Sequence, residues 1–147
     1  MKVCRECNET KSLEEFSKNK QCKDGITNLC KKCKSLIGIE FKKTKVGIID
    51  VIYQSQKASS KKRGHIKPYY TITWLREWMF SQELFHELYN NWYISGYDKY
   101  IKPSVDRKND YLPYTKDNIQ LITFGENVKK KRPNYGFIKK GANKCLT

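Results

Sequence analysis

Four cysteines near the N-terminus have the spacing of metal ligands. They form two Cys-x-x-Cys pairs, Cys4 with Cys7 and Cys30 with Cys33, and residues 8–29 lie between the pairs. Two such turns can surround one zinc ion with four thiolates, and the closed shell is that of a structural rather than a catalytic site. We therefore predict one structural Zn²⁺ bound by these four side chains. The alternatives are a redox-active thiol pair or scattered buried thiols.

The charge of the chain narrows the class of partner. Its 147 residues include 30 Lys+Arg and 15 Asp+Glu, which gives a formal net charge of +15. Such an excess attracts polyanions, and DNA, RNA or an anionic membrane surface would each fit on charge alone. The partner we expect is a nucleic acid, double-stranded DNA in particular, and not a membrane. The sequence has no apolar run long enough to cross a membrane and no apolar signal core at its N-terminus, so we expect a cytoplasmic protein. In that compartment the two remaining cysteines, Cys22 and Cys145, are expected to be bystanders.

The four cysteines define the first of four predicted regions. Residues 1–45 form the zinc-binding module, a small ribbon or knuckle, with a short helix after Cys30 that carries Leu36, Ile37 and Phe41 on one side. Residues 46–69 are predicted to be a basic linker. Within it, VGIIDVIYQ fits a short helix or a strand, because a short apolar run has no decisive period. Ser59, Ser60 and Gly64 favour a flexible break after this run.

Residues 70–95 have the clearest helical pattern in the chain. Leu75, Trp78 and Met79 recur at helical spacing and predict a first helix. Ser81 is predicted to cap a second helix, which Gly96 would end. The apolar stripe of this second helix is predicted to be core, and it consists of Leu84, Phe85, Leu88, Tyr89 and Trp92.

The following residues change character and predict an α+β fold. Residues 102–107 indicate a strand, 109–115 a turn-rich loop, 118–123 a half-buried strand, and 125–131 a helix. Residues 70–135 would therefore form one domain of a helical pair followed by strand, loop, strand and helix. Residues 136–147 are predicted to be a basic C-terminal tail that a polyanion would order.

Residues 63–132 resemble the HNH endonuclease superfamily of phages and bacteria. The resemblance lies in RGHIKP and in the stretch LYNNWYISGYDKYIKPSVDRKNDYLPYTKDNIQLITFGEN. The N-terminal segment CRECNETKSLEEFSKN, with the later CKKC, resembles the zinc module fused to such phage proteins. For a phage-encoded chain, the compartment would be the cytoplasm of the host.

The resemblance implies a ββα-metal core in which two strands and a helix hold one Mg²⁺ or Mn²⁺ against the scissile phosphate. Asp106 matches the metal-binding Asp, Asn118 the central Asn that orients the site, and Asn127 the final metal ligand. Arg107 stands where the family has its general-base His. Without the resemblance, an Asp-Arg pair at the end of a strand is more simply a salt bridge.

Arg107 changes the chemistry that the site can perform. A guanidinium keeps its proton at any working pH and cannot act as a base, although it can bind a phosphate or stabilise charge in the transition state. His65, in the sequence Lys-Lys-Arg-Gly-His, is the better candidate base, and the alternative is a solvated loop residue. His86 lies in the apolar helical stretch and is expected at its surface or edge. A hydroxide bound to the metal is a third route.

Two basic segments flank the predicted site and are candidates for contacts with DNA phosphates. The alternative for both is a solvated charged surface. The residues concerned are Lys61, Lys62, Arg63, Lys129, Lys130, Lys131 and Arg132.

The sequence thus favours a DNA-binding, metal-dependent endonuclease or nickase. One alternative is a catalytically inactive, HNH-derived DNA-binding or regulatory protein, which Arg107 favours. Another is an RNA-binding zinc protein whose tyrosines stack on unpaired bases.

Overall fold

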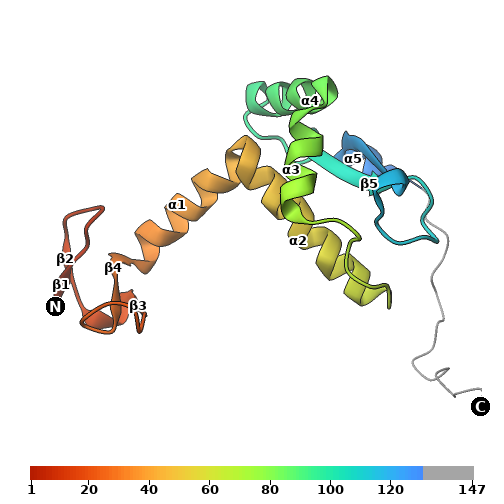
Figure 1. The fold of residues 1–147 in the computed structure, drawn as a ribbon. Helices are drawn as coiled ribbons and strands as arrows, with labels where there is room; N and C mark the ends of the chain where they lie inside the picture. Colours follow the sequence, from red (N-terminus) through yellow and green to blue (C-terminus); the bar gives the residue numbers. More distant parts are fainter. Residues whose placement is uncertain (131–147) are drawn as a thin grey trace, which may run out of the picture. The chain divides into compact units, whose positions relative to one another are not determined.

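The structure is a computed structural model that describes residues 1–130 (Figure 1). This part of the chain is mixed α+β, with five α-helices and three two-stranded antiparallel sheets, which confirms the expected class. It divides into two compact units, residues 1–51 and the residues from 52 onward. Within residues 1–130, no helix is both long enough and apolar enough to cross a membrane.

The first unit contains two short hairpins and a helix. Strand β1 (Lys2–Val3) pairs with β2 (Thr10–Lys11), and β3 (Phe16–Lys18) pairs with β4 (Ile26–Cys30). Helix α1 (Lys31–Lys43) begins directly after β4, with Cys30 as its N-cap. The expected helix after Cys30 is therefore present, and it is longer than predicted. Its apolar residues Leu36, Ile37 and Phe41 are exposed.

Residues 46–69, predicted to be a basic linker, are largely helical. Helix α2 (Lys45–Lys62) passes through Ser59 and Ser60, where the sequence indicated a break. The buried residues of α2 recur every three or four positions, and burial of such a stripe outweighs the modest helix propensity of serine. These residues are Ile48, Ile49, Ile52, Gln56 and Ser60.

Gly64 ends α2 and fixes the position of the residue after it. Its φ of 73° lies in the left-handed region, where glycine has no steric cost. The Gly64 N–H donates to the carbonyl of Lys61 at 3.2 Å, and the His65 N–H donates to the carbonyl of Ser60 at 2.9 Å. This pair of bonds is a Schellman motif. His65 is thus held by backbone bonds at the end of the helix.

Helices α3 (Ile72–Phe80) and α4 (Glu83–Ile94) pack against each other and supply much of the core of the second unit. Leu75, Met79, Phe85 and Trp92 are buried, as the apolar pattern predicted, whereas Leu84 is exposed.

The ends of these two helices differ in how well the sequence predicted them. Ser81 does not cap α4: it ends α3, where its hydroxyl donates to the carbonyl of Trp78, and Gln82 is the N-cap of α4. Gly96 ends α4 with a φ of 72°, as expected. There the Tyr97 N–H donates to the carbonyl of Trp92, and their rings lie 4.9 Å apart.

The last described elements follow the expected order of strand, loop, strand and helix. Strand β5 (Pro103–Arg107) pairs antiparallel with β6 (Ile119–Thr123), and α5 (Phe124–Lys129) follows at once. Thr123 and Glu126 form a capping box that starts α5. Both α4 and α5 contact the β5–β6 hairpin. Residue 131, the predicted end of this helix, and the tail at 136–147 lie outside the described residues.

Candidate functional site

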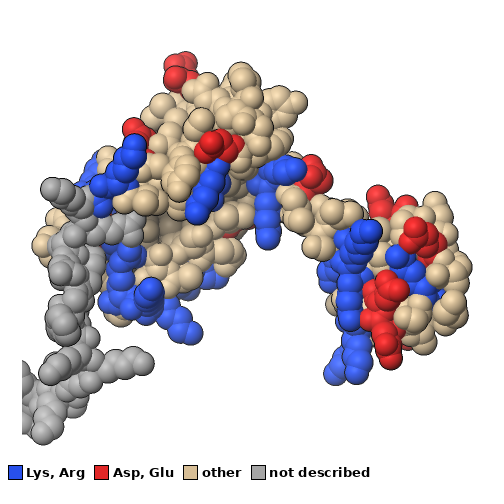
Figure 2. Space-filling model, turned by 180° about the vertical axis from the view of Figure 1, so that it is seen from behind, with Lys and Arg blue, Asp and Glu red and all other residues tan. Residues whose placement is uncertain are grey.

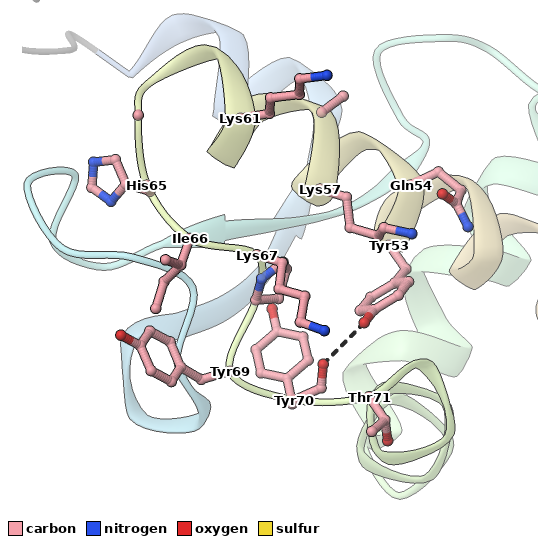
Figure 3. Close-up of a pocket in the computed structure, with 13 residues that line it drawn as sticks. Tyr53, Gln54, Lys57, Lys61, His65, Ile66, Lys67, Tyr69, Tyr70 and Thr71 are labelled. Carbon is pink, nitrogen blue, oxygen red and sulfur yellow. Dashed lines mark hydrogen bonds between the residues drawn. The ribbon is translucent and has the colours of Figure 1, made fainter.

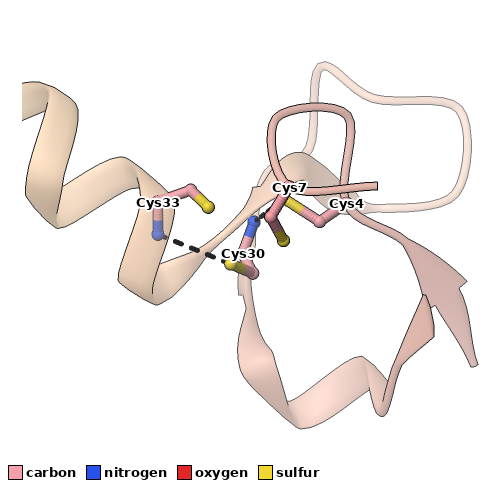
Figure 4. Close-up of side chains that lie close together, drawn as sticks. All are labelled: Cys4, Cys7, Cys30 and Cys33. Atoms are coloured by element: carbon pink, nitrogen blue, oxygen red, sulfur yellow. Dashed lines mark hydrogen bonds between the residues drawn. The ribbon is translucent and has the colours of Figure 1, made fainter. Parts of the chain in front are cut away.

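The four predicted zinc ligands lie together in the first unit. The sulfur atoms of Cys4, Cys7, Cys30 and Cys33 are all within 4.8 Å of one another (Figure 4). Zn–S bonds of about 2.3 Å in a tetrahedron place sulfur atoms about 3.8 Å apart, so small shifts would bring these side chains into a four-thiolate shell. Cys22 is not part of the cluster, and Cys145 lies outside the described residues.

The surroundings of the cluster shift the pKa values of its thiols in opposite directions. The Cys30 N–H donates to Cys4 Sγ at 3.3 Å, and the Cys33 N–H donates to Cys30 Sγ at 3.4 Å. Backbone N–H groups of Cys30 and Cys7 lower the pKa of Cys4 to about 6. A hydrogen bond with the Cys30 thiol, together with burial, raises the pKa of Cys33 to about 12. A bound divalent cation would let all four sulfurs ionise together.

The ammonium group of Lys130 lies at the end of strand β5 in the second unit. The carboxylate of Asp106 is buried, with 3% of its side chain exposed, and its Oδ2 lies 2.9 Å from Lys130 Nζ. The same ammonium lies 3.3 Å from Asp110 Oδ2 and donates to the carbonyl of Arg107 at 2.6 Å. Three oxygens therefore converge on one positive charge. We name this group, Asp106, Asp110, the Arg107 carbonyl and Lys130, the oxygen cluster.

Asp110 belongs to this cluster although the sequence analysis did not single it out. It lies four residues after Asp106, in the loop that follows β5. The sequence did offer one sign that Asp110 could join the site, namely a second acidic residue shortly after the aspartate at the strand end. The resemblance did not single out Asp110, because the family pattern assigns its metal ligands to other positions.

Arg107 anchors the loop between the strands. Its guanidinium donates to the carbonyl of Leu112 at 2.9 Å, lies 3.6 Å from Asp110 Oδ1, and stacks over the Tyr114 ring at 5.2 Å. Only 3% of its side chain is exposed. The guanidinium in this arrangement is turned toward the protein and has little surface to offer a phosphate.

Asn118 holds the same loop from its far end. Its Oδ1 accepts from the Asn109 N–H at 2.8 Å, and its Nδ2 donates to the carbonyls of Asn109 and Pro113 at 3.0 Å each. These bonds close the loop that carries Asp110. The side chain of Asn118 therefore fixes the backbone of this loop.

Replacement of Asn118 by Ala is expected to destabilise the protein by about 3 kcal/mol, since each lost hydrogen bond contributes about 1 kcal/mol. The shift in the urea midpoint at unchanged slope measures this loss. Asn90→Ala, at an exposed helical position, is the control and should have little effect. Equal midpoints for Asn118→Ala and the wild type would contradict the anchoring role.

Asn127 lies on the same face of the hairpin as Asp106. Its Nδ2 donates to the hydroxyl of Ser104 at 3.0 Å. Ser104 and Asp106 are two positions apart on β5, so their side chains point to the same face of the strand. The amide nitrogen of Asn127 thus binds Ser104 and links α5 to β5.

His65 lies near Arg107, because the segment after α2 packs beside the loop after β5. The Tyr69 N–H donates to the carbonyl of Tyr114 at 3.0 Å. Burial lowers the pKa of His65, and the charges of Arg107 and Arg63 lower it further. The imidazole is therefore mainly neutral at pH 7 and able to accept a proton.

The other histidine is occupied elsewhere. His86 makes a hydrogen bond through Nε2 with the carbonyl of Phe80 at 2.9 Å, and its ring lies 5.5 Å from that of Phe85. This places it at the edge of the α3–α4 core, as the sequence indicated.

The predicted phosphate-binding residues differ in exposure and in their ion pairs. Lys61, Lys62 and Lys129 are exposed and Arg63 is half-buried, whereas Lys130 is paired with the two aspartates. Lys131 and Arg132 lie outside the described residues. Figure 2 shows several lysine and arginine side chains, with few acidic ones, on the face of the second unit that it displays.

Comparisons with known proteins found no match. No family model, no curated protein and no solved structure matches this chain.

Proposed function

We propose that this protein binds DNA and hydrolyses its phosphodiester bonds at a divalent cation held by the oxygen cluster, as an HNH-like endonuclease or nickase. The observation that supports this most is the convergence of Asp106 Oδ2, Asp110 Oδ2 and the Arg107 carbonyl on a single positive charge. Carboxylate and carbonyl oxygens are the donors that Mg²⁺ and Mn²⁺ prefer.

Each residue has a role in this proposal. Asp106, Asp110 and the Arg107 carbonyl would hold the cation after Lys130 withdraws, and the cation would offset charge on the phosphate. His65 would accept the proton of the attacking water. Asn118 keeps the Asp110 loop closed, and Asn127 fixes α5 on the strand that carries Asp106.

Incubation of the full-length protein with supercoiled plasmid tests the proposal. Mg²⁺ or Mn²⁺ should convert the plasmid to nicked or linear DNA, and the plasmid should stay supercoiled when neither ion is added. If the protein bound the plasmid but left it supercoiled with either ion, the proposed endonuclease activity would be refuted.

One observation favours a second candidate, a DNA-binding or regulatory protein that does not cleave. The ammonium of Lys130 already offsets the two carboxylates at 2.9 and 3.3 Å, so the oxygen cluster is neutralised by the chain itself. Tight binding of duplex DNA without cleavage would select this candidate.

Lys130→Met separates the two candidates. Removal of the ammonium leaves two buried carboxylates together, so Mn²⁺ affinity should rise roughly tenfold, which corresponds to a coupling on the order of 1–2 kcal/mol. Calorimetric titration with Mn²⁺ measures the affinity, and the upward shift of the melting temperature with Mn²⁺ gives a second reading.

Lys129→Met is the matched control, because Lys129 is the exposed neighbour and its loss removes the same charge. It should leave Mn²⁺ binding unchanged. Absence of Mn²⁺ binding in all three proteins would argue against the metal site and for the candidate that does not cleave.

A further inference from the structure

A groove of about 1160 Å³ runs along the second half of α2, bounded on its other side by residues 64–71 (Figure 3). Pockets that hold one drug-sized ligand measure about 300–1,000 Å³, so this groove can take an extended ligand. All of its lining residues belong to the second unit.

The groove is basic. Lys57 and Lys61 line it from α2, and Lys67 lines it from the following segment. None of its lining residues is acidic. In Figure 3 the amino groups of Lys57 and Lys67 lie over the groove, and His65 lies at the end where the chain leaves the helix. A ligand with several negative charges along its length matches this spacing of cations.

Three tyrosines line the groove. The Tyr53 hydroxyl donates to the carbonyl of Tyr70 at 3.1 Å, and the Tyr70 hydroxyl donates to Gln56 Oε1 at 3.1 Å. Tyr69 donates its backbone N–H to the carbonyl of Tyr114 and is 58% exposed. A flat ligand can therefore reach the ring of Tyr69.

We propose that this groove binds an unpaired polynucleotide strand, with phosphates on Lys57, Lys61 and Lys67 and a base stacked on Tyr69. Bases of a duplex hide their faces in the helical stack, so only an unpaired strand offers phosphates and base faces together. An acidic peptide would match the lysines but gain little from the ring. The inference rests on the proposed function and specifies the strand that the site receives.

One end of the groove is lined by His65, the base of the proposed function. A strand in the groove would therefore bring one of its phosphates to this histidine.

Fluorescence anisotropy with labelled oligothymidine, without added Mg²⁺ or Mn²⁺ so that no cleavage occurs, tests the stacking contact. Tyr69→Ala should weaken binding about tenfold or more, as loss of one base–aromatic stack does. Tyr69→Phe keeps the ring and should bind like the wild type. Because Tyr69 is largely exposed, neither change removes core packing. Equal affinity of the Ala and Phe variants would overturn the stacking contact.

The salt dependence tests the three lysines. Each phosphate contact with a single strand contributes about 0.7 to the slope of log affinity against log salt, so replacing all three by Gln should reduce the slope by about 2. The matched control replaces three exposed lysines of the first unit, Lys18, Lys20 and Lys23. An equal change of slope in both triple variants would show general attraction rather than a built groove.

A duplex of the same length separates this inference from the proposed function. Stronger binding of the duplex than of the single strand would overturn the inference, even if plasmid cleavage is intact. Tight single-strand binding that Tyr69→Ala abolishes would uphold it, even if no cleavage is found.

Discussion

Removal of zinc from the first unit is expected to unfold that unit while the second unit stays folded. Its cysteine core is small: Cys4, Cys30 and Cys33 surround Phe16, with Ile26 and Leu29 partly buried against them. Zinc binding to such a module contributes on the order of 10 kcal/mol, more than so few apolar contacts can replace. Loss of dispersed amide resonances of residues 2–33 on addition of chelator, with those of residues 72–127 unchanged, is the measurement.

Two serine variants test which cysteines are responsible. Cys4→Ser removes a buried ligand and should lower the zinc content, measured by mass spectrometry of the native protein, from one ion per chain to a small fraction. Cys22→Ser lies in the same unit but outside the cluster, so it should keep one ion per chain. Loss of zinc from Cys22→Ser, or its retention in Cys4→Ser, would refute the assignment.

His65→Ala is expected to lower the cleavage rate by about 10²–10⁴-fold, the usual contribution of a general base. In the proposed mechanism cleavage needs the neutral imidazole, so the wild-type rate should rise with pH through the pKa of His65. Burial, Arg107 and Arg63 hold that pKa below 6.5, so most of the rise should lie below pH 7. The rate of nicking across this pH range is the measurement.

The control is His86→Ala, because His86 packs at the α3–α4 edge. It should keep the same inflection, which His65→Ala should lose. Asp106→Asn separates the two roles: it should lose Mn²⁺ binding, whereas His65→Ala should retain it. If the residual rate of His65→Ala kept the wild-type pH profile, a different base would have to be sought.

The sequence predicted what short-range physics determines. Each Cys-x-x-Cys turn fixes the spacing of its own two sulfur atoms, and the chemistry of a four-thiolate zinc site predicted that the two pairs would meet. The alternation of residues 118–123 gave β6, and Gly96 ended α4 where a left-handed residue was needed. These features depend on neighbours within a few positions, so one sequence is enough to predict them.

The rest depends on contacts between distant residues. Ser59 and Ser60 indicated a break, but α2 continues because Gln56 and Ser60 lie on its buried side. Lys130 was expected to face DNA, yet its ammonium binds Asp106 from 24 positions away. Asp110 joins the cluster only because Arg107 and Asn118 fold its loop back. No pattern in the sequence encodes which charges will meet in this way.

The backbone bonds that end α2 make position 65 interchangeable. Because the amide of residue 65, rather than its side chain, binds the Ser60 carbonyl, a different side chain there leaves the helix end intact. Substitution at Gly64 would instead force a side chain into a backbone geometry that costs about 1–2 kcal/mol. A different side chain at position 65 therefore leaves the scaffold unchanged, so the proposed general base could be exchanged there without loss of the fold.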